Sequence, residues 1–167
     1  MSTTDATNPP SLTLGGATPI FRVASLRASI GYYVNALGFK VNWDAGGFAS
    51  VSRDRCCLFL CEGDQGHSGT WTWIGVNDTE SLAAEYRQSG ATIRHPPTNY
   101  PWAYEMQVED PDGNVLRFGS DPKKDEPFGP FLDMHGRLWP PSQGSTIVCE
   151  QPAITAASCT ITPRASR

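Results

Sequence analysis

Hydrophobic and polar positions in this chain follow two periods, and the order of the periods repeats once. An alternating stretch comes first, apolar residues at helical spacing follow, and three more alternating stretches complete the unit. In the first half of the chain these elements are expected at residues 19–23, 26–37, 39–44, 48–53 and 56–62. In the second half they are expected at residues 71–76, 78–90, 92–94, 102–109 and 114–119.

The two halves correspond at a fixed offset. The matched positions, each 52 residues apart, are Ile30 with Leu82, Val34 with Tyr86, Gly38 with Gly90, and Val41 with Ile93. Such a correspondence indicates an internal duplication. The pattern therefore predicts an α+β fold of two strand–helix–three-strand modules, residues 17–63 and 70–120, in which Ser25 and Asp78 cap the helices.

The ends of the chain have a different composition. Residues 1–16 are rich in Ser, Thr, Pro and Gly and are expected to form a flexible arm. Residues 121–139 contain enough apolar side chains to dock on the domain, and one helical turn is expected there. Residues 140–167 show no period, and their Ser-, Thr- and Pro-rich composition predicts a disordered tail.

Composition narrows the class of protein. The 167 residues are 39% hydrophobic and 18% charged, as in an ordinary globular domain, and the net charge of −4 argues against a nucleic-acid partner. No apolar stretch is long enough to span a membrane. The five cysteines are an odd number without a Cys-x-x-Cys pair, so we expect free thiols in a reducing compartment and a cytoplasmic protein.

A β-hairpin is expected around Asp110-Pro-Asp-Gly113, where Pro111 presets the φ angle and Gly113 accepts a positive φ. With Asn114, and with Leu37-Gly-Phe39 after the first helix, this motif resembles the vicinal oxygen chelate superfamily. Within it, the chain is most similar to bleomycin resistance proteins and their glyoxalase-related neighbours, over residues 17–120. The resemblance implies paired βαβββ modules that form a half-open sheet with a cleft.

In metal-dependent members of that superfamily, four strands each supply one ligand to the cleft. The positions that match them are Thr18, Phe59, Trp71 and Arg117. None is a His, Glu or Gln, and two aromatic rings beside an arginine do not coordinate a divalent cation. We therefore expect no metal and no cofactor.

Drug-binding members instead line the cleft with aromatic side chains. The resemblance places Trp43 and Phe48 at aromatic positions, Trp73 at the position of a stacking tryptophan, and Trp102 and Glu105 in a matching Pro-Trp and Glu arrangement. Rigid aromatic faces suit flat heteroaromatic ligands and attract cationic tails. The full candidate ligand-binding set is Trp43, Phe48, Phe59, Trp71, Trp73, Trp102, Tyr104, Glu105 and Arg117.

Alternation assigns faces to these side chains. On strand 56–62, Leu58 and Leu60 point to one side and are expected to pack on the helices, which leaves Phe59 on the concave side. Glu105 and Arg117 either form a salt bridge across the hairpin or act on a ligand. A concave side that has collapsed into a second apolar core is the alternative to a ligand cleft.

Three functions stay open at this stage. The favoured hypothesis is a non-catalytic homodimer that sequesters a flat, cationic antibiotic of the bleomycin type and so confers resistance. The second is a superfamily enzyme (a lyase, an isomerase or a glyoxalase-like enzyme) with Glu105 or Tyr104 as acid or base, for which the sequence offers no nucleophile or carboxylate pair. The third is a small-molecule binding domain for another ligand.

Overall fold

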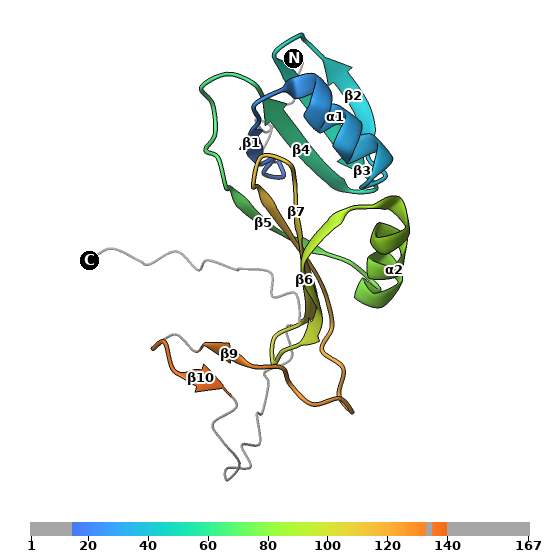
Figure 1. Ribbon diagram of the computed structural model, residues 1–167, viewed down its shortest axis with the longest axis vertical. Helices are drawn as coiled ribbons and strands as arrows, with labels where there is room; N and C mark the ends of the chain where they lie inside the picture. Colours follow the sequence, from blue (N-terminus) through green and yellow to red (C-terminus); the bar gives the residue numbers. More distant parts are fainter. Residues whose placement is uncertain (1–14, 133–134, 140–167) are drawn as a thin grey trace, which may run out of the picture.

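The computed structural model of the protein describes residues 15–132 and 135–139. The arm and the tail expected from composition fall almost entirely outside these residues. Within them, Figure 1 shows two modules in succession, the first in blue to green and the second in green to orange.

The first module is a four-stranded sheet with one helix. Its elements are β1 (Ile20–Arg22), α1 (Leu26–Asn35), β2 (Lys40–Asp44), β3 (Phe48–Arg53) and β4 (Cys56–Cys61). The strand order is β1-β4-β3-β2, with β1 parallel to β4 and the other pairs antiparallel.

The second module repeats this arrangement. Its elements are β5 (Trp71–Gly75), α2 (Thr79–Ser89), β6 (Thr92–Asn99), β7 (Tyr104–Glu109) and β8 (Val115–Ser120). The order β5-β8-β7-β6, with β5 parallel to β8, is that of the first module. The predicted α+β architecture of two βαβββ modules is therefore confirmed.

Side-chain caps begin both helices, as the sequence predicts. The Ser25 hydroxyl accepts a hydrogen bond from the Ala28 N–H at 3.4 Å, and the Asp78 carboxylate accepts from the N–H groups of Glu80 and Ser81 at 3.0 and 3.1 Å. At the other end of α2, Gly90 has φ 81°, a left-handed conformation that only glycine adopts without strain. The caps fix where each helix starts relative to its sheet.

One hydrophobic core runs through both modules. Alternate residues of the strands, such as Val51, Leu58 and Phe118, are buried against the helices. Tyr33 of α1 and Tyr86 of α2 are fully buried in this core. The helix-covered faces of the two sheets thus pack in a shared interior, and the opposite faces carry most of the candidate ligand residues, with the exception of Tyr104.

The β7–β8 turn connects the second module to the first. The Asp110 carboxylate accepts a hydrogen bond from the Tyr33 hydroxyl at 3.0 Å, and Asp112 accepts from the Ala24 N–H and the Ser29 hydroxyl. Burial raises the pKa of Asp110, although the hydrogen bonds from Asn114 and Tyr33 act in the opposite direction. The Asp-Pro-Asp-Gly motif thereby joins the modules as well as making the turn.

The two sheets do not close into one. Within residues 15–132 and 135–139, one isolated parallel bridge, Phe21 with His67, joins β1 to the segment before β5. Beyond that bridge β5 remains an edge strand, and β1 pairs only with the Phe59–Cys61 half of β4.

Two elements differ from the sequence-based expectation. Strand β6 continues to Asn99 through Pro96 and Pro97, because it is an edge strand with register shifts at these positions and needs no N–H there. The segment expected to contain a helical turn instead forms an antiparallel pair, β9 (Phe131–Leu132) with β10 (Leu138–Trp139). In the described part of the chain, both helices are too short to cross a bilayer.

Candidate functional site

Three aromatic rings form a cluster on the open face of the first sheet. The ring centres of Trp43 and Phe48 lie 5.6 Å apart, those of Trp43 and Phe59 5.6 Å, and those of Phe48 and Phe59 5.4 Å. Trp43 remains 42% exposed. Phe59 lies opposite Leu58 and Leu60 as alternation requires, so these residues make an aromatic surface rather than a closed core.

A β-bulge turns Trp43 onto this face. The pairing of β2 with β3 shifts register between Val41 and Trp43, so two successive residues of β2 point to the same side. Asn42 consequently bonds the hydroxyl groups of Ser50 and Ser52 at 2.9 and 2.8 Å, beside the rings. The open face of the first module therefore combines an aromatic half with a polar half.

On the second sheet, Trp73 lies over backbone. A Cβ built on Gly119 would be 3.1 Å from the indole of Trp73, and one on Gly75 would be 3.4 Å from it. The two glycines let the ring lie flat against the sheet, and Trp73 still has 56% of its surface exposed. One broad aromatic face is therefore presented to solvent.

Trp71 shares that side of the sheet but has a cationic neighbour. The guanidinium of Arg94 lies 5.2 Å from the centre of its ring, and Arg94 also pairs with Glu109 at 2.9 Å. Trp71 is 50% exposed. It extends the aromatic surface of Trp73 along β5.

Glu105 and Arg117 form an ion pair in the floor beside Trp73. Arg117 pairs with Trp73 across the strands, and Glu105 pairs with Gly119, so all of these residues occupy neighbouring rows. Arg117 donates from Nη2 to Oε1 of Glu105, which confirms the salt bridge. Glu105 is 2% exposed, and its Oε2, like Nε of Arg117, is buried without a hydrogen-bond partner.

Trp102 belongs to a second aromatic group at the end of this face. Its ring stacks on Tyr100 with centres 5.0 Å apart and planes 3° apart. Phe131 from the extension packs edge-on, with its ring centre 4.8 Å from that of Trp102. One face of Trp102 is therefore occupied within the chain, and the residue is 49% exposed. Trp102 borders the site rather than lying in its centre.

Tyr104 lies on the opposite face from Glu105. Its hydroxyl bonds the Glu80 carboxylate, and the Lys123 ammonium is 4.0 Å from its ring centre. Burial, followed by the bond to Glu80, raises the pKa of the Tyr104 phenol. The structure does not bring Tyr104 together with the other candidate ligand residues.

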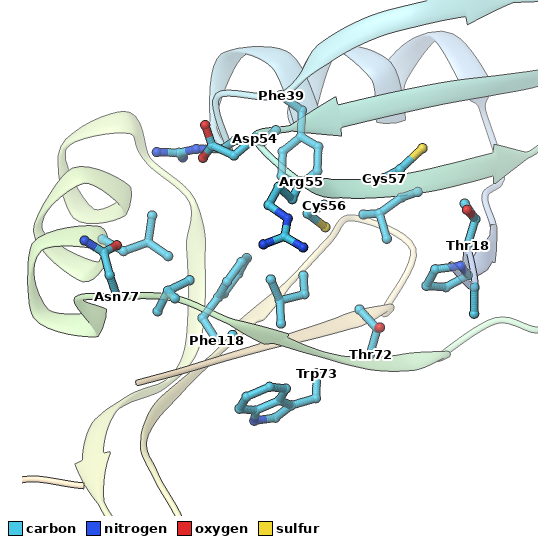
Figure 2. A pocket seen from close by; sticks show the side chains of 18 of the residues that line it. Thr18, Phe39, Asp54, Arg55, Cys56, Cys57, Thr72, Trp73, Asn77 and Phe118 are labelled. Carbon is cyan, nitrogen blue, oxygen red and sulfur yellow. The ribbon is translucent and has the colours of Figure 1, made fainter. Parts of the chain in front are cut away.

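Between the modules there is a cleft of about 990 Å³, shown in Figure 2. It lies between the β3–β4 turn of the first module and β5 with the start of α2 of the second. Its walls come mainly from the helix-covered sides of the strands, including Leu58 and Ile74, with Thr18 at one end. Trp73 borders it from the far side of β5.

The residues at the metal-ligand positions do not form a donor set. Thr18 lines the cleft, Phe59 is in the first aromatic cluster, Trp71 contacts Arg94, and Arg117 is paired with Glu105. Across residues 15–132 and 135–139, no three His, Cys, Asp or Glu side chains gather where they could hold a metal ion. These four positions present two aromatic rings, a threonine and an arginine that is paired with Glu105.

Some residues at the site were not anticipated. Tyr100 and Phe131 join Trp102, and the tight approach of Gly129 to Thr98 fixes the extension that carries Phe131. A signal for Tyr100 exists in the sequence, since Tyr100-Pro-Trp102 spaces two rings on one turn. No local pattern predicts the contact of Phe131 with Trp102, because Phe131 lies in the extension that follows the repeat.

Comparison with solved structures gives similar folds at low identity. The crystal structure of bleomycin-binding protein from bleomycin-producing Streptomyces verticillus, complexed with copper(II)-bleomycin, has a TM-score of 0.57 and 24% identity, covering 68% of this chain and 100% of that one. TnmS3, an antibiotic binding protein from Streptomyces sp. CB03234, has a TM-score of 0.59 and 20% identity over 68% and 100%. A glyoxalase/bleomycin resistance protein/dioxygenase from Nocardioides has 0.54 and 18% over 71% and 91%.

No curated protein sequence matches the chain. The sequence profile of one family does match it, over residues 17–118, which is more than half of its length and covers both modules. Together with the two βαβββ modules, this match shows that the chain belongs to the Glyoxalase/Bleomycin resistance protein/Dioxygenase superfamily.

Proposed function

We propose that the protein is a binding protein that sequesters a flat, cationic antibiotic of the bleomycin type, without a metal of its own, and thereby confers resistance in the cytoplasm. The observation that carries the proposal is the pair of exposed aromatic faces, Trp43 with Phe48 and Phe59 on one sheet and Trp73 with Trp71 on the other. Exposed tryptophans on rigid strands offer stacking surface at small entropic cost.

The ligand stacks on Trp73 and Phe48, and Trp43, Phe59 and Trp102 form the walls. The exposed faces of Trp71 and Trp73 support the preference for a cation, because the negative face of an aromatic ring attracts positive charge. The solved proteins of similar fold that bind antibiotics support the same class of ligand.

An acid–base enzyme is the weaker alternative. Tyr104 is held on the other face by Glu80 and Lys123, and Glu105 is held by Arg117. Neither side chain is therefore placed to exchange a proton with a substrate on the open face. We do not propose a catalytic residue.

The test is a titration of tryptophan fluorescence with metal-free and copper-loaded bleomycin. Trp73→Ala and Phe48→Ala should each weaken binding about thirtyfold, which corresponds to about 2 kcal/mol for a central stacking ring. Phe128→Ala is the matched control, since Phe128 is an exposed ring on the extension outside both aromatic faces, and its affinity should equal that of the wild type. Absence of saturable binding up to millimolar bleomycin in the wild type would reject the proposal.

A further inference from the structure

Arg55 places a positive charge in the middle of the cleft between the modules, and no described residue pairs with it. In Figure 2 the guanidinium of Arg55 points from the β3–β4 turn into the middle of the space, towards β5. Arg55 has no hydrogen-bond or ion-pair partner among the described residues, whereas its neighbour Arg53 is held by Glu85 and by the Leu37 carbonyl at 2.8 Å. Arg55 is exposed, so its unpaired guanidinium is accessible in the open cleft and can recognise an anion.

The walls around Arg55 are largely apolar. Phe39, Leu58 and Phe118 lie behind the cleft wall and are almost fully buried. The apolar lining residues that remain accessible are Ile74, Val76 and Leu82, all half-buried. The volume of about 990 Å³ lies at the upper end of the range for small-molecule sites. An anion that enters must therefore carry an apolar body.

The acidic residues at the rim do not cancel this charge. Asp78 is committed to the N-terminus of α2, where it accepts from two N–H groups and from the Ser81 hydroxyl at 2.6 Å. The carboxylate of Asp54, on the left-handed turn residue with φ 52°, lies at the rim and away from the centre in Figure 2. Neither carboxylate pairs with Arg55, and a single guanidinium in a cleft with two carboxylates at its rim favours a monoanion over a phosphate dianion.

We propose that this cleft binds a monocarboxylate on an apolar body, such as a medium-chain fatty acid, with the carboxylate on Arg55 and the chain against Ile74, Val76 and Leu82. The planar guanidinium matches both carboxylate oxygens. The site is separate from the antibiotic site, because its walls are the helix-covered sides of β4 and β5 and the aromatic faces lie on the other sides of these strands.

The probes are octanoate and 1-octanol, which share a chain and differ in charge. Titrations of the full-length protein, followed by the Ile74 δ1-methyl signal in NMR, should show octanoate binding about tenfold more tightly than 1-octanol. Arg55→Gln should abolish that discrimination and Arg55→Lys should retain part of it. Arg27→Gln, an exposed arginine of α1, is the matched control and should behave as the wild type.

The Ile20 methyl group, on the open side of β1 beside Phe59, is the internal reference and should not shift. Equal affinity for the two probes in the wild type, or shifts at Ile20 in place of Ile74, would overturn the proposal. So would an Ile74 signal that moves with protein concentration before any probe is added, because a second copy of the chain would then occupy the cleft.

Unchanged bleomycin affinity in Arg55→Gln would show that the two sites are independent, and a parallel loss would place octanoate in the antibiotic site and reject a separate cleft.

Discussion

At the scale of single residues, the ion pair with Arg117 stabilises the buried carboxylate of Glu105 beside the Trp73 ring. The same strand carries a second glutamate, Glu109, paired with Arg94 on the same face. The Glu105 side chain is almost fully buried, whereas Glu109 and Arg94 are partly open to solvent. The two pairs therefore form an internal comparison of a buried and an exposed ion pair.

Removing the arginine of each pair should have unequal effects. Arg117→Gln should lower the free energy of unfolding by about 2 kcal/mol or more, because it leaves a buried carboxylate without its counter-ion. Arg94→Gln should cost less than about 1 kcal/mol, as for other exposed pairs. Urea denaturation measures both, and the double variant Glu105→Gln/Arg117→Gln should recover part of the loss. Equal losses for the two arginine variants would contradict the buried role of Glu105.

Cys56 offers a second prediction at this scale. Burial in the cleft wall, followed by the neighbouring Cys57, raises the pKa of the Cys56 thiol to about 11. At pH 8 its thiolate fraction should be about a hundredfold lower than that of an unperturbed cysteine, so alkylation should be slower by a similar factor. Iodoacetamide labelling followed by fragment mass spectrometry measures the rate, and denatured protein is the control. Rapid labelling of native Cys56 at pH 8 would show that the wall opens.

At the scale of elements, the sequence predicts those features of helices and strands that depend on neighbouring residues along the chain. Alternation correctly separates Leu58 from Phe59, and capping chemistry correctly begins α2 at Asp78. The bulge that turns Trp43 beside Asn42 is not predicted, because it depends on the pairing of β2 with β3. Alternation also places Tyr104 opposite Glu105 on β7, a conflict within the candidate ligand set that the structure makes visible.

The β6 strand illustrates the limit of turn signals. Pro96 and Pro97 suggest that a strand should stop at Arg94, but β6 runs to Asn99 because no strand of the described residues pairs with its outer edge. Asn99 then holds the extension, accepting from the Lys123 N–H and donating to the carbonyls of Lys123 and Glu126. A contact of this sequence separation leaves no local pattern to detect.

The two helix caps should differ in importance. Asp78 accepts three hydrogen bonds, whereas Ser25 accepts one long bond from Ala28, so Asp78→Ala should lower the melting temperature more than Ser25→Ala. The bonds from Ser81 lower the pKa of Asp78, so its contribution is present above the unfolded-state pKa and is lost as pH falls through the folded one. Melting curves from pH 7 to pH 2 should show a smaller acid-induced decrease for Asp78→Asn than for the wild type. A parallel decrease would mean that the charge of Asp78 does not stabilise α2.

At the scale of the whole molecule, the packing leaves the aromatic faces outside. The shared core uses the helix-covered side of each sheet, and the bridge between Phe21 and His67 is the main strand contact between the modules. The open faces consequently carry large exposed rings: Trp43, Trp71, Trp73 and Trp102. Surfaces of this kind mark sites for a ligand or for another protein surface.

We expect a homodimer in which a two-fold axis brings such faces together. A self-complementary contact suits this chain, since the two sheets of each copy are related by duplication and each presents an aromatic face with a polar border. Light scattering at micromolar concentration should give about twice the 18.1 kDa mass of the chain.

Phe59→Glu should shift the protein towards the monomer, because a carboxylate in the centre of the Trp43–Phe48 cluster cannot be buried without a partner. The same variant should lose bleomycin binding if the ligand lies between the faces of two copies. Gln88→Glu, at an exposed position of α2, adds the same single negative charge, is the matched control and should remain dimeric. A wild-type protein that stays monomeric up to high micromolar concentration yet binds bleomycin would show that each chain holds the ligand alone, and would reject the dimeric cleft.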